Sequence, residues 1–412
     1  MPGAGGSGAV PMPASVVAVL RGPLAEPALG PAAAVRVLVA DAATGRPLVA
    51  TAADDPAPPA STTKLLTAVA ALDRLGAATQ LRTRVFAAAP PDAAGTVTGD
   101  LVLVGAGDPT LTAGPPQEAG QAGLADLVAA LRAAGVRRVT GRVVGDGSLF
   151  TGGASDPGWL PGYVTGGSVA PVTALQVDGG RFAPSARPAP RYADPALAAV
   201  QALARQLRAA GVATAGTAVG LVPAGAVELA HVDGLNVQAL TERMLAESDN
   251  DIAEALGRLV AQERGLPSDA GAAARAVIDA VGALGVPTSG VALSDTSGLS
   301  LRDRIPAATL VALLRLTVTA GHPELRAVAL GIPVAGRSGT LAERFRTGAA
   351  RAGFSRVHAK TGALSGVSTL VGWVVDRGGR LLVFSLGSSA TVNRPGAEAA
   401  LDRAAAALAT VQ

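Results

Sequence analysis

The chain has 412 residues, 49% of them hydrophobic, which is enough to bury a large core and predicts two or more domains. Its 34 Lys and Arg nearly balance 31 Asp and Glu, and only 2% of residues are aromatic. Nucleic-acid-binding surfaces combine clustered basic residues with aromatic ones, so no nucleic-acid partner is expected. The sequence has no cysteine, and its three histidines are isolated from one another, so we expect neither a metal site nor a cofactor.

Residues 1–33 are predicted to form an N-terminal extension. Residues 1–8 are uncharged and glycine-rich, without the basic segment that opens a signal peptide. An apolar stretch at 16–20 is too short to span a membrane and is followed by Arg21. The sequence shows neither a signal peptide nor a membrane span. We therefore expect a mature-length or trimmed chain, or one whose true start lies upstream.

A β-hairpin is predicted next, from alternating segments at 35–40 and 47–50. Residues 61–64 (Ser-Thr-Thr-Lys) then precede an apolar run typical of a helix, in which residues three apart share one face. Ser61 and Lys64 would therefore be neighbours, and an adjacent amine can take the proton that a serine loses when it acts as a nucleophile. The alternative is a serine that caps the helix beside a solvated lysine.

Lys64 and Lys360 are the only lysines in the chain, and every other basic side chain except histidine is arginine. Arginine stays charged at any pH that a protein tolerates, whereas a buried lysine can become neutral. The two positions that keep lysine are therefore candidates for chemistry that requires an amine.

An inserted α/β domain is predicted at 93–234, because the stretch between Ser61 and Ser248 is longer than a helical subdomain needs. Its strand-like and helix-like segments alternate along the chain: 96–104, 125–134, 138–144 and 195–210. A split domain formed by 34–92 and 235–412 is expected to surround this insert.

The second part of the split domain is predicted to carry two more motifs. Residues 248–250 (Ser-Asp-Asn) fall within a helix expected at 237–259, and residues 360–362 (Lys-Thr-Gly) fall on a strand. The other elements expected here are helices at 272–284, 307–320 and 396–408, and strands at 369–375 and 380–386. They predict an antiparallel sheet with helices packed on it, and the motifs meeting where sheet and helices join.

Each motif supplies side chains suited to acyl transfer. The Ser248 hydroxyl can relay a proton to a leaving group, and the Asn250 carboxamide can both donate and accept hydrogen bonds. On a strand, Lys360 and Thr361 can meet a carboxylate, while Gly362 lets a substrate backbone approach closely. Each motif alone is weak evidence of function, but the three motifs in this order are typical of class A β-lactamases and penicillin-binding proteins.

The chain resembles the low-molecular-mass, class C penicillin-binding proteins, the D-alanyl-D-alanine carboxypeptidases and endopeptidases of peptidase family S13. The resemblance runs from about Ala34 to the C-terminus. It implies an α+β fold, with a penicillin-binding/β-lactamase-like transpeptidase domain interrupted by the inserted α/β domain. Besides the three motifs it includes residues 107–111 (GDPTL), 145–150 (GDGSLF), 297–300 (SGLS) and 339–341 (GTL).

The resemblance implies a role for each motif residue. Ser61 is the acylated nucleophile and Lys64 its base, Ser248 and Asn250 relay a proton and position the substrate, and Lys360 and Thr361 bind its terminal carboxylate.

Several positions depart from the family pattern or match it only in part. The threonine usual after Lys-Thr-Gly is Ala363 here, which leaves its backbone N–H available for an oxyanion hole with that of Ser61. The family's arginine after Ser-Gly-Leu-Ser is displaced to Arg302. Asp146 matches an aspartate that, in the family, faces the amino end of a diaminopimelate side chain. Asp146 could equally be a structural residue of a turn. Leu364 and Ser365 match neighbouring pocket positions.

The predicted function is therefore that of a serine D-alanyl-D-alanine carboxypeptidase or endopeptidase. The resemblance implies peptidoglycan stem peptides as substrates, β-lactam antibiotics as covalent inhibitors and an extracytoplasmic location. The alternatives are a β-lactamase or esterase with the same motifs and an inert peptidoglycan-binding relative. The first is disfavoured by the long insert and by the lack of an obvious deacylating glutamate, and the second by the intact pair of Ser61 and Lys64.

Overall fold

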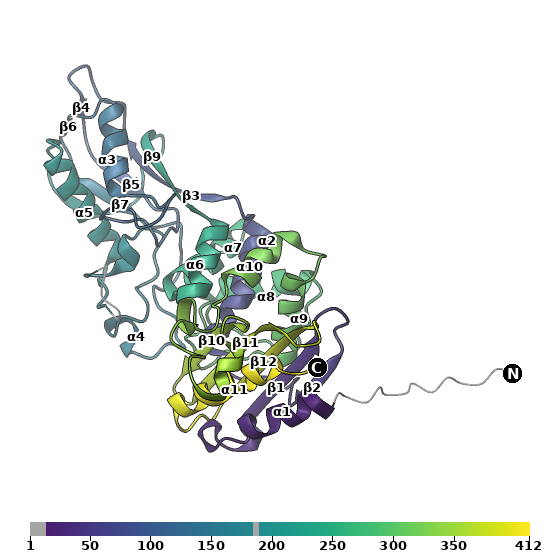
Figure 1. Cartoon of the computed structure of the whole chain (residues 1–412). Coiled ribbons are helices and arrows are strands. Elements are labelled where there is room, and N and C mark those ends of the chain that lie inside the picture. Colours follow the sequence, from purple (N-terminus) through teal and green to yellow (C-terminus); the bar gives the residue numbers. More distant parts are fainter. Residues whose placement is uncertain (1–13, 184–188) are drawn as a thin grey trace.

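The computed structural model describes residues 14–183 and 189–412, which form two lobes built on separate β-sheets (Figure 1). The predictions made for residues 1–8 lie outside the described residues. The mixed α+β class is confirmed. Within the described ranges, no helix is long and apolar enough to cross a membrane.

The main sheet has five antiparallel strands in the order β10-β11-β12-β1-β2. Residues on β1 alternate between two cores, with Val37 and Val39 on one side and Leu38 and Ala40 on the other. Because successive side chains of a strand point to opposite faces, this sheet is buried on both faces. Its strands are β1 (Val35–Asp41), β2 (Pro47–Thr51), β10 (His358–Leu364), β11 (Val367–Val375) and β12 (Leu381–Ser388).

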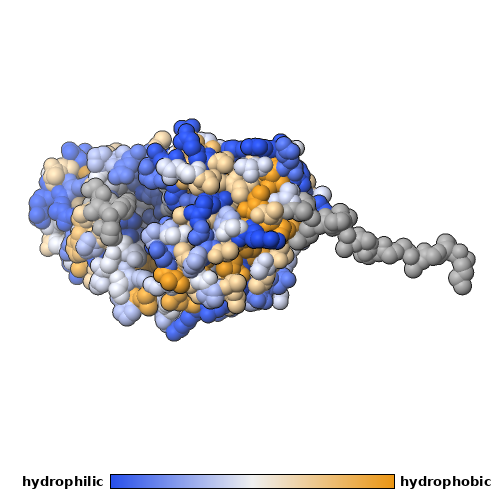
Figure 2. Space-filling view, turned by 60° about the horizontal axis from the view of Figure 1, so that its bottom comes forward, coloured by the Kyte–Doolittle hydropathy of each residue, from blue (hydrophilic) through white to orange (hydrophobic). Residues whose placement is uncertain are grey.

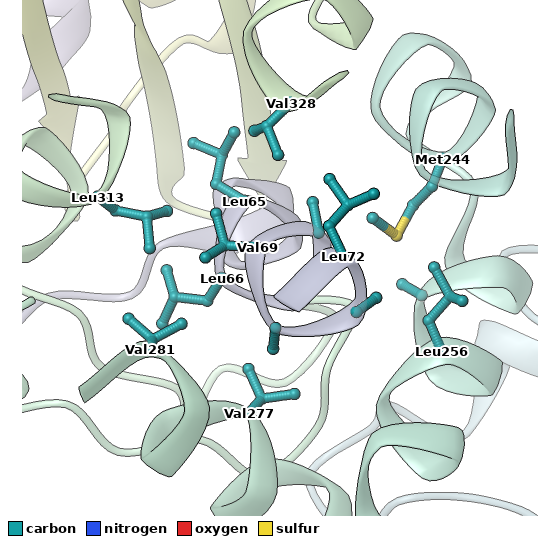
Figure 3. Close-up of a cluster of buried hydrophobic side chains, with 14 of the residues drawn as sticks. Leu65, Leu66, Val69, Leu72, Met244, Leu256, Val277, Val281, Leu313 and Val328 are labelled. Atoms are coloured by element: carbon teal, nitrogen blue, oxygen red, sulfur yellow. The ribbon is translucent and has the colours of Figure 1, made fainter. Parts of the chain in front are cut away.

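One face of the main sheet is covered by a group of helices with α2 at its centre. Residues 64–72 of α2 are all buried and, apart from Lys64 and Thr67, all apolar, which is typical of a helix surrounded by protein. Figure 3 shows Leu65, Leu66, Val69 and Leu72 of α2 among side chains from the surrounding helices. The group contains α2 (Lys64–Leu75), α6 (Val237–Glu247), α7 (Asn250–Glu263), α8 (Ala270–Ala283), α9 (Ala307–Val318) and α10 (Arg326–Gly331).

The second sheet has the order β8-β7-β5-β3-β9 and belongs to the other lobe. Strands β5, β7 and β8 are parallel, while β3 is antiparallel to both β5 and β9. This lobe contains the strands β3 (Gln80–Ala87), β5 (Leu101–Val104), β7 (Val143–Asp146), β8 (Thr217–Val219) and β9 (Val227–Asn236), the strand pair β4 (Thr96–Val97) and β6 (Arg138–Val139), and the helices α3 (Leu124–Ala133), α4 (Gly162–Thr165) and α5 (Pro195–Ala209).

The pairing of β3 and β9 in this sheet bears on where the inserted domain begins and ends. The prediction placed its boundaries at 93 and 234, but β3 already pairs with β5 and β9 of the second sheet. We therefore propose that the inserted domain runs from about residue 80 to residue 236, with β3 and β9 as the two strands that enter and leave it.

Residues 14–33 of the predicted N-terminal extension pack against the domain that contains the main sheet. Helix α1 (Ala14–Leu24) packs against α11 (Arg394–Leu408) on the second face of the main sheet. Val16 and Leu20 of α1 are buried in this core. Figure 2 shows further hydrophobic residues gathered on the surface beside the point where the described chain begins. Because the 16–20 stretch was judged only as a signal or membrane segment, its helical apolar face was overlooked.

Replacing Leu20 with alanine is expected to lower the free energy of unfolding by about 2–4 kcal/mol, since it leaves a cavity between α1 and α11. Leu20 is 1% exposed. Chemical denaturation monitored by circular dichroism would measure the change. Val392, which is 78% exposed, supplies the control, because Val392→Ala should change stability by less than about 0.5 kcal/mol. Equal effects from the two substitutions would contradict the placement of α1 in the core.

Candidate active site

Ser61 and Lys64 lie where the chain enters the central helix α2. Ser61 is in the 3-10 turn Ala60–Thr63, and Lys64 is the first residue of α2. The Lys64 Nζ donates to Ser61 Oγ at 3.2 Å, to Asn250 Oδ1 at 2.6 Å and to the Ser297 carbonyl at 2.6 Å. Lys64 is completely buried, which rules out the alternative of a solvated lysine. The structure thus brings the amine beside the serine hydroxyl.

The environment of Lys64 favours loss of its proton. Burial lowers the pKa of Lys64 from 10.5 to about 8, because an ammonium is poorly stabilised away from water. Acidic side chains act in the opposite direction and keep the pKa of Lys64 from falling further, with Asp295 first, followed by Asp249, Glu254 and Asp251. An amine with a pKa near 8 is a suitable general base near neutral pH.

Ser248 lies at a break between two helices, and the prediction of one helix over 237–259 is wrong at this point. Helix α6 ends at Glu247, Ser248 takes a left-handed conformation with φ 58°, and Asp249 caps α7 by accepting from the Ile252 N–H at 3.0 Å. Non-glycine residues seldom adopt positive φ, and such strained positions cluster at functional sites. The break directs the Ser248 hydroxyl toward Lys360, whose Nζ donates to Ser248 Oγ at 2.9 Å.

Asn250 connects Lys64 to the inserted domain. Its Oδ1 accepts from Lys64, and its Nδ2 donates to the Ser168 carbonyl at 2.8 Å. Because both ends of the carboxamide are engaged, its orientation is fixed by the hydrogen bonds.

Strand β10 supplies the third motif. Lys360 is completely buried, and its Nζ donates to Ser248 Oγ and to the Thr361 carbonyl, both neutral oxygens. Burial and the neighbouring Lys64 hold the pKa of Lys360 well below 10.5. The Thr361 hydroxyl lies 2.8 Å from that of Thr340, which the resemblance had included only as part of residues 339–341.

A side chain at Gly362 would clash with the surrounding protein. A Cβ at this position would lie 2.1 Å from Thr369 Oγ1 and 2.7 Å from the Pro59 carbonyl oxygen. The space beside Gly362 is therefore occupied by Thr369 of β11 and by the segment that leads to Ser61. Close packing of β10 against this segment holds the first and third motifs together.

A surface cleft runs along the motif residues. Ser61, Ser248, Asn250 and Thr361 line it. Ala363, Leu364 and Ser365 line the same cleft, where the sequence predicted pocket positions. Its other lining residues were not predicted as site residues: Leu160, Tyr163, Ser168, Leu299, Thr340, Gly366, Thr391, Val392 and Arg394. Most come from loops, and periodicity gives no signal for loop residues that converge through the fold.

Asp146 and Arg302 are not among the described residues that line this cleft. Asp146 is 3% exposed, and its two oxygens accept from the Ser148 N–H at 2.9 Å and the Val222 N–H at 2.7 Å. A carboxylate engaged by its own turn fits the structural reading of Asp146, which the sequence had left open. Arg302 is exposed outside the cleft lining, so the assignment of these two residues to substrate binding is not supported.

Across residues 14–183 and 189–412, no group of three or more histidine or acidic side chains is arranged to hold a metal ion. The chemistry that the cleft offers with its own side chains is that of a serine nucleophile, a buried amine base and a second amine suited to an anionic group.

Comparison with known proteins gives a consistent result. The model of the D-Ala-D-Ala carboxypeptidase 3 (S13) family matches residues 17–191 and 188–410. Carboxypeptidase Rv3627c of Mycobacterium tuberculosis is 39% identical over 382 residues, which cover 92% of this chain and 80% of that protein. Carboxypeptidase DacB of Mycolicibacterium smegmatis is 36% identical over 410 residues, covering 98% of this chain and 85% of that protein.

The fold has a counterpart among solved structures. Penicillin binding protein 4 (dacB) of Haemophilus influenzae superposes with a TM-score of 0.77 at 22% identity, over 90% of this chain and 94% of that one. The same protein complexed with a β-lactam gives a TM-score of 0.72, with the same identity and coverage. This similarity confirms the predicted penicillin-binding fold.

Proposed function

Because this chain belongs to the S13 family of D-Ala-D-Ala carboxypeptidases, we propose that it hydrolyses the terminal D-Ala-D-Ala bond of peptidoglycan stem peptides through an acyl-enzyme on Ser61. The observation that carries the assignment of residues is the buried Lys64 amine, 3.2 Å from Ser61 Oγ. A serine needs an adjacent base to attack a carbonyl, and Lys64 is positioned to be that base.

Acylation begins when neutral Lys64 takes the proton of Ser61 and Ser61 Oγ attacks the carbonyl carbon of the penultimate D-alanine. The C–N bond to the terminal D-alanine then breaks, and Ser248 relays to the leaving amine the proton that Lys64 took from Ser61, which leaves Lys64 neutral again. Water subsequently hydrolyses the ester and restores the Ser61 hydroxyl. The Asn250 carboxamide supports the role of Lys64 as the base, because its Oδ1 accepts a hydrogen bond from the amine and holds it in place.

The oxyanion of the tetrahedral intermediate would be stabilised by the backbone N–H groups of Ser61 and Ala363. Both residues line the cleft. Backbone donors need no particular side chain, so alanine at position 363 is compatible with this role.

Lys360 is suited to the terminal carboxylate of the substrate. Its hydrogen-bond acceptors are neutral, and its pKa is lowered by burial and by Lys64. A carboxylate beside it would supply the missing negative charge and favour its protonated form. A charged Lys360 would in turn disfavour a proton on Lys64, so binding of the correct substrate would prepare the base.

The site of action follows from the substrate. Peptidoglycan lies outside the cytoplasmic membrane, so the proposal places this enzyme on the extracytoplasmic side. β-Lactams would acylate the same serine, and the Haemophilus protein complexed with a β-lactam supports this expectation.

Intact mass spectrometry after incubation with benzylpenicillin tests the proposal. One adduct per chain is expected, located on Ser61 by peptide mapping, because the strained β-lactam acylates the serine as the substrate would. Ser61→Ala is the control and should form none. A long-lived adduct together with release of D-alanine from a D-Ala-D-Ala peptide supports the peptidase, whereas rapid loss of the adduct without peptide hydrolysis would indicate a β-lactamase. An unlabelled native protein would contradict the proposal.

A further inference from the structure

A buried aspartate organises the turn that contacts Lys64. Asp295 is fully buried at the start of residues 295–300, which we call the Asp295 turn. Its Oδ1 accepts from the Ser297 N–H at 3.0 Å and the Gly298 N–H at 2.6 Å. Its Oδ2 accepts from the Ser300 N–H at 2.8 Å and from Trp159 Nε1 at 2.7 Å. Four N–H donors on two oxygens match the acceptor capacity of an ionised carboxylate.

The Asp295 turn is also bound to the helix that carries the base. The Ser297 carbonyl accepts from Lys64 Nζ at 2.6 Å, and the Thr296 carbonyl accepts from Thr67 Oγ1 at 2.6 Å. Two consecutive carbonyl groups of the turn therefore face α2. The position of the Ser297 carbonyl depends on how Asp295 folds the turn, because Asp295 accepts the N–H of Ser297 itself.

The inserted domain supplies one of the four donors. Trp159 is 9% exposed and packs with Val169 and with Leu299, and Leu299 lines the cleft. Through its indole N–H it contacts Asp295, which lies far from it in the sequence. This hydrogen bond links the inserted domain to the surroundings of the base.

The acids near Asp295 are held in the neutral form. Burial, followed by the nearby Asp295 carboxylate, raises the pKa of Asp303 well above its usual range. The same two causes raise the pKa of Glu254. Adjacent carboxyl groups in a buried site do not all ionise together, and Asp295 has the most N–H donors of the three.

We propose that Asp295 is a positioning residue for Lys64: it fixes the Ser297 carbonyl that holds the amine, and Trp159 of the inserted domain fixes Asp295. The inference rests on the proposed role of Lys64 as the base. It gives the inserted domain a function in acylation besides lining the cleft.

Asp295→Asn tests the charge through the pH dependence of acylation by a fluorescent penicillin. The titratable groups around Lys64 are Asp295, Asp249, Asp251 and Glu254, with Lys360 beside it, and of the four acids Asp295 raises the pKa of Lys64 most. Removing this charge lowers the pKa of Lys64, so more of the amine is neutral at a given acidic pH. The acid limb of the profile is expected to move about one pH unit toward lower pH. The maximal rate is expected to fall about tenfold, because an amide cannot accept four N–H bonds.

Trp159→Phe tests the positioning, since it removes the indole N–H and keeps an aromatic ring. The charge of Asp295 remains, so the acid limb is expected to stay in place while the maximal rate falls about fivefold. Trp373→Phe is the matched control. Trp373 is the only other tryptophan and donates its Nε1 to the Ala329 carbonyl at 3.4 Å, and its substitution should leave acylation unchanged.

The outcomes separate this inference from the proposed function. If the parent protein forms no adduct on Ser61, the proposed function itself fails. If the parent is acylated but Asp295→Asn leaves the acid limb unmoved, or Trp159→Phe behaves like Trp373→Phe, then Asp295 and Trp159 are only structural and the inference is wrong. Thermal unfolding of each variant identifies losses due to misfolding, and Trp159→Phe provides the decisive measurement if Asp295→Asn does not fold.

Discussion

Replacing Lys64 with arginine is expected to reduce acylation of Ser61 by roughly a thousandfold or more. Arginine keeps the positive charge but cannot lose its proton at a pH that the protein tolerates, so it cannot act as the base. The rate of labelling by a fluorescent penicillin measures the effect. In the parent protein the same rate is expected to rise with pH through about 8, because burial lowers the pKa of Lys64 to that value and only the neutral amine accepts a proton.

The buried position of Lys64 makes a second variant necessary. Arginine is longer than lysine and could disturb the packing around a residue with no exposed surface. Lys64→Met is close in size, has no charge and should fold, yet it also lacks a base, so it is expected to be as poorly acylated as Lys64→Arg. The two variants therefore separate loss of charge from loss of the base. Labelling of either variant at the parent rate would show that Lys64 is not the base.

Ser61 and Lys64 could be predicted from the sequence because the chemistry of a nucleophile and its base restricts the type of residue at each position. Lysine is kept at only two positions in the chain, and the structure buries both amines, each hydrogen-bonded to a serine that lines the cleft. Serine and lysine three residues apart at the start of a helix are neighbours by local geometry alone. The proximity of Ser61 and Lys64 can therefore be predicted from the sequence without knowledge of the tertiary fold.

Other features depend on contacts between distant segments, and the sequence did not reveal them. Gly362 was predicted to let a substrate backbone approach, and nothing in the sequence indicated that Thr369 Oγ1 and the Pro59 carbonyl lie beside it. Asp146 was a candidate for ligand recognition, yet its oxygens are taken by the backbone of its own lobe. The role of Asp295 depends on donors from Trp159 and from its own turn, which no periodicity signals.

Two boundaries in the structure differ from the predicted ones. Apolar periodicity continues across Ser248, so a single helix was predicted, but one residue with positive φ is enough to end α6 and start α7 in a new direction. Strand β3 follows directly after the loop that ends α2 and was assigned to the first lobe, although its partners are in the second sheet. Strand partners cannot be read from a pattern of alternation.

Gly298→Ala is expected to weaken both stability and acylation, because Gly298 lies against the residue before the nucleophile. A Cβ at Gly298 would be 2.0 Å from the Ala60 carbonyl oxygen and 2.8 Å from Thr63 Oγ1, and the φ of Gly298 is +81°. Ala60 has a positive φ of 49° itself, so the backbone at Ser61 has little freedom to accommodate a shift. Displacement of Ala60 would move Ser61 away from Lys64 and the oxyanion position.

Gly285→Ala provides a matched control for this substitution. Gly285 has φ +82°, and a Cβ there would meet nothing within 4 Å. Both substitutions include the cost of a positive φ, about 1 kcal/mol, but only Gly298→Ala adds the steric clash, about 1–3 kcal/mol more. Urea unfolding should show this difference, and only Gly298→Ala should slow penicillin labelling, by about tenfold or more. If both variants were labelled at the parent rate, the contact between the Asp295 turn and Ala60 would have no part in positioning Ser61.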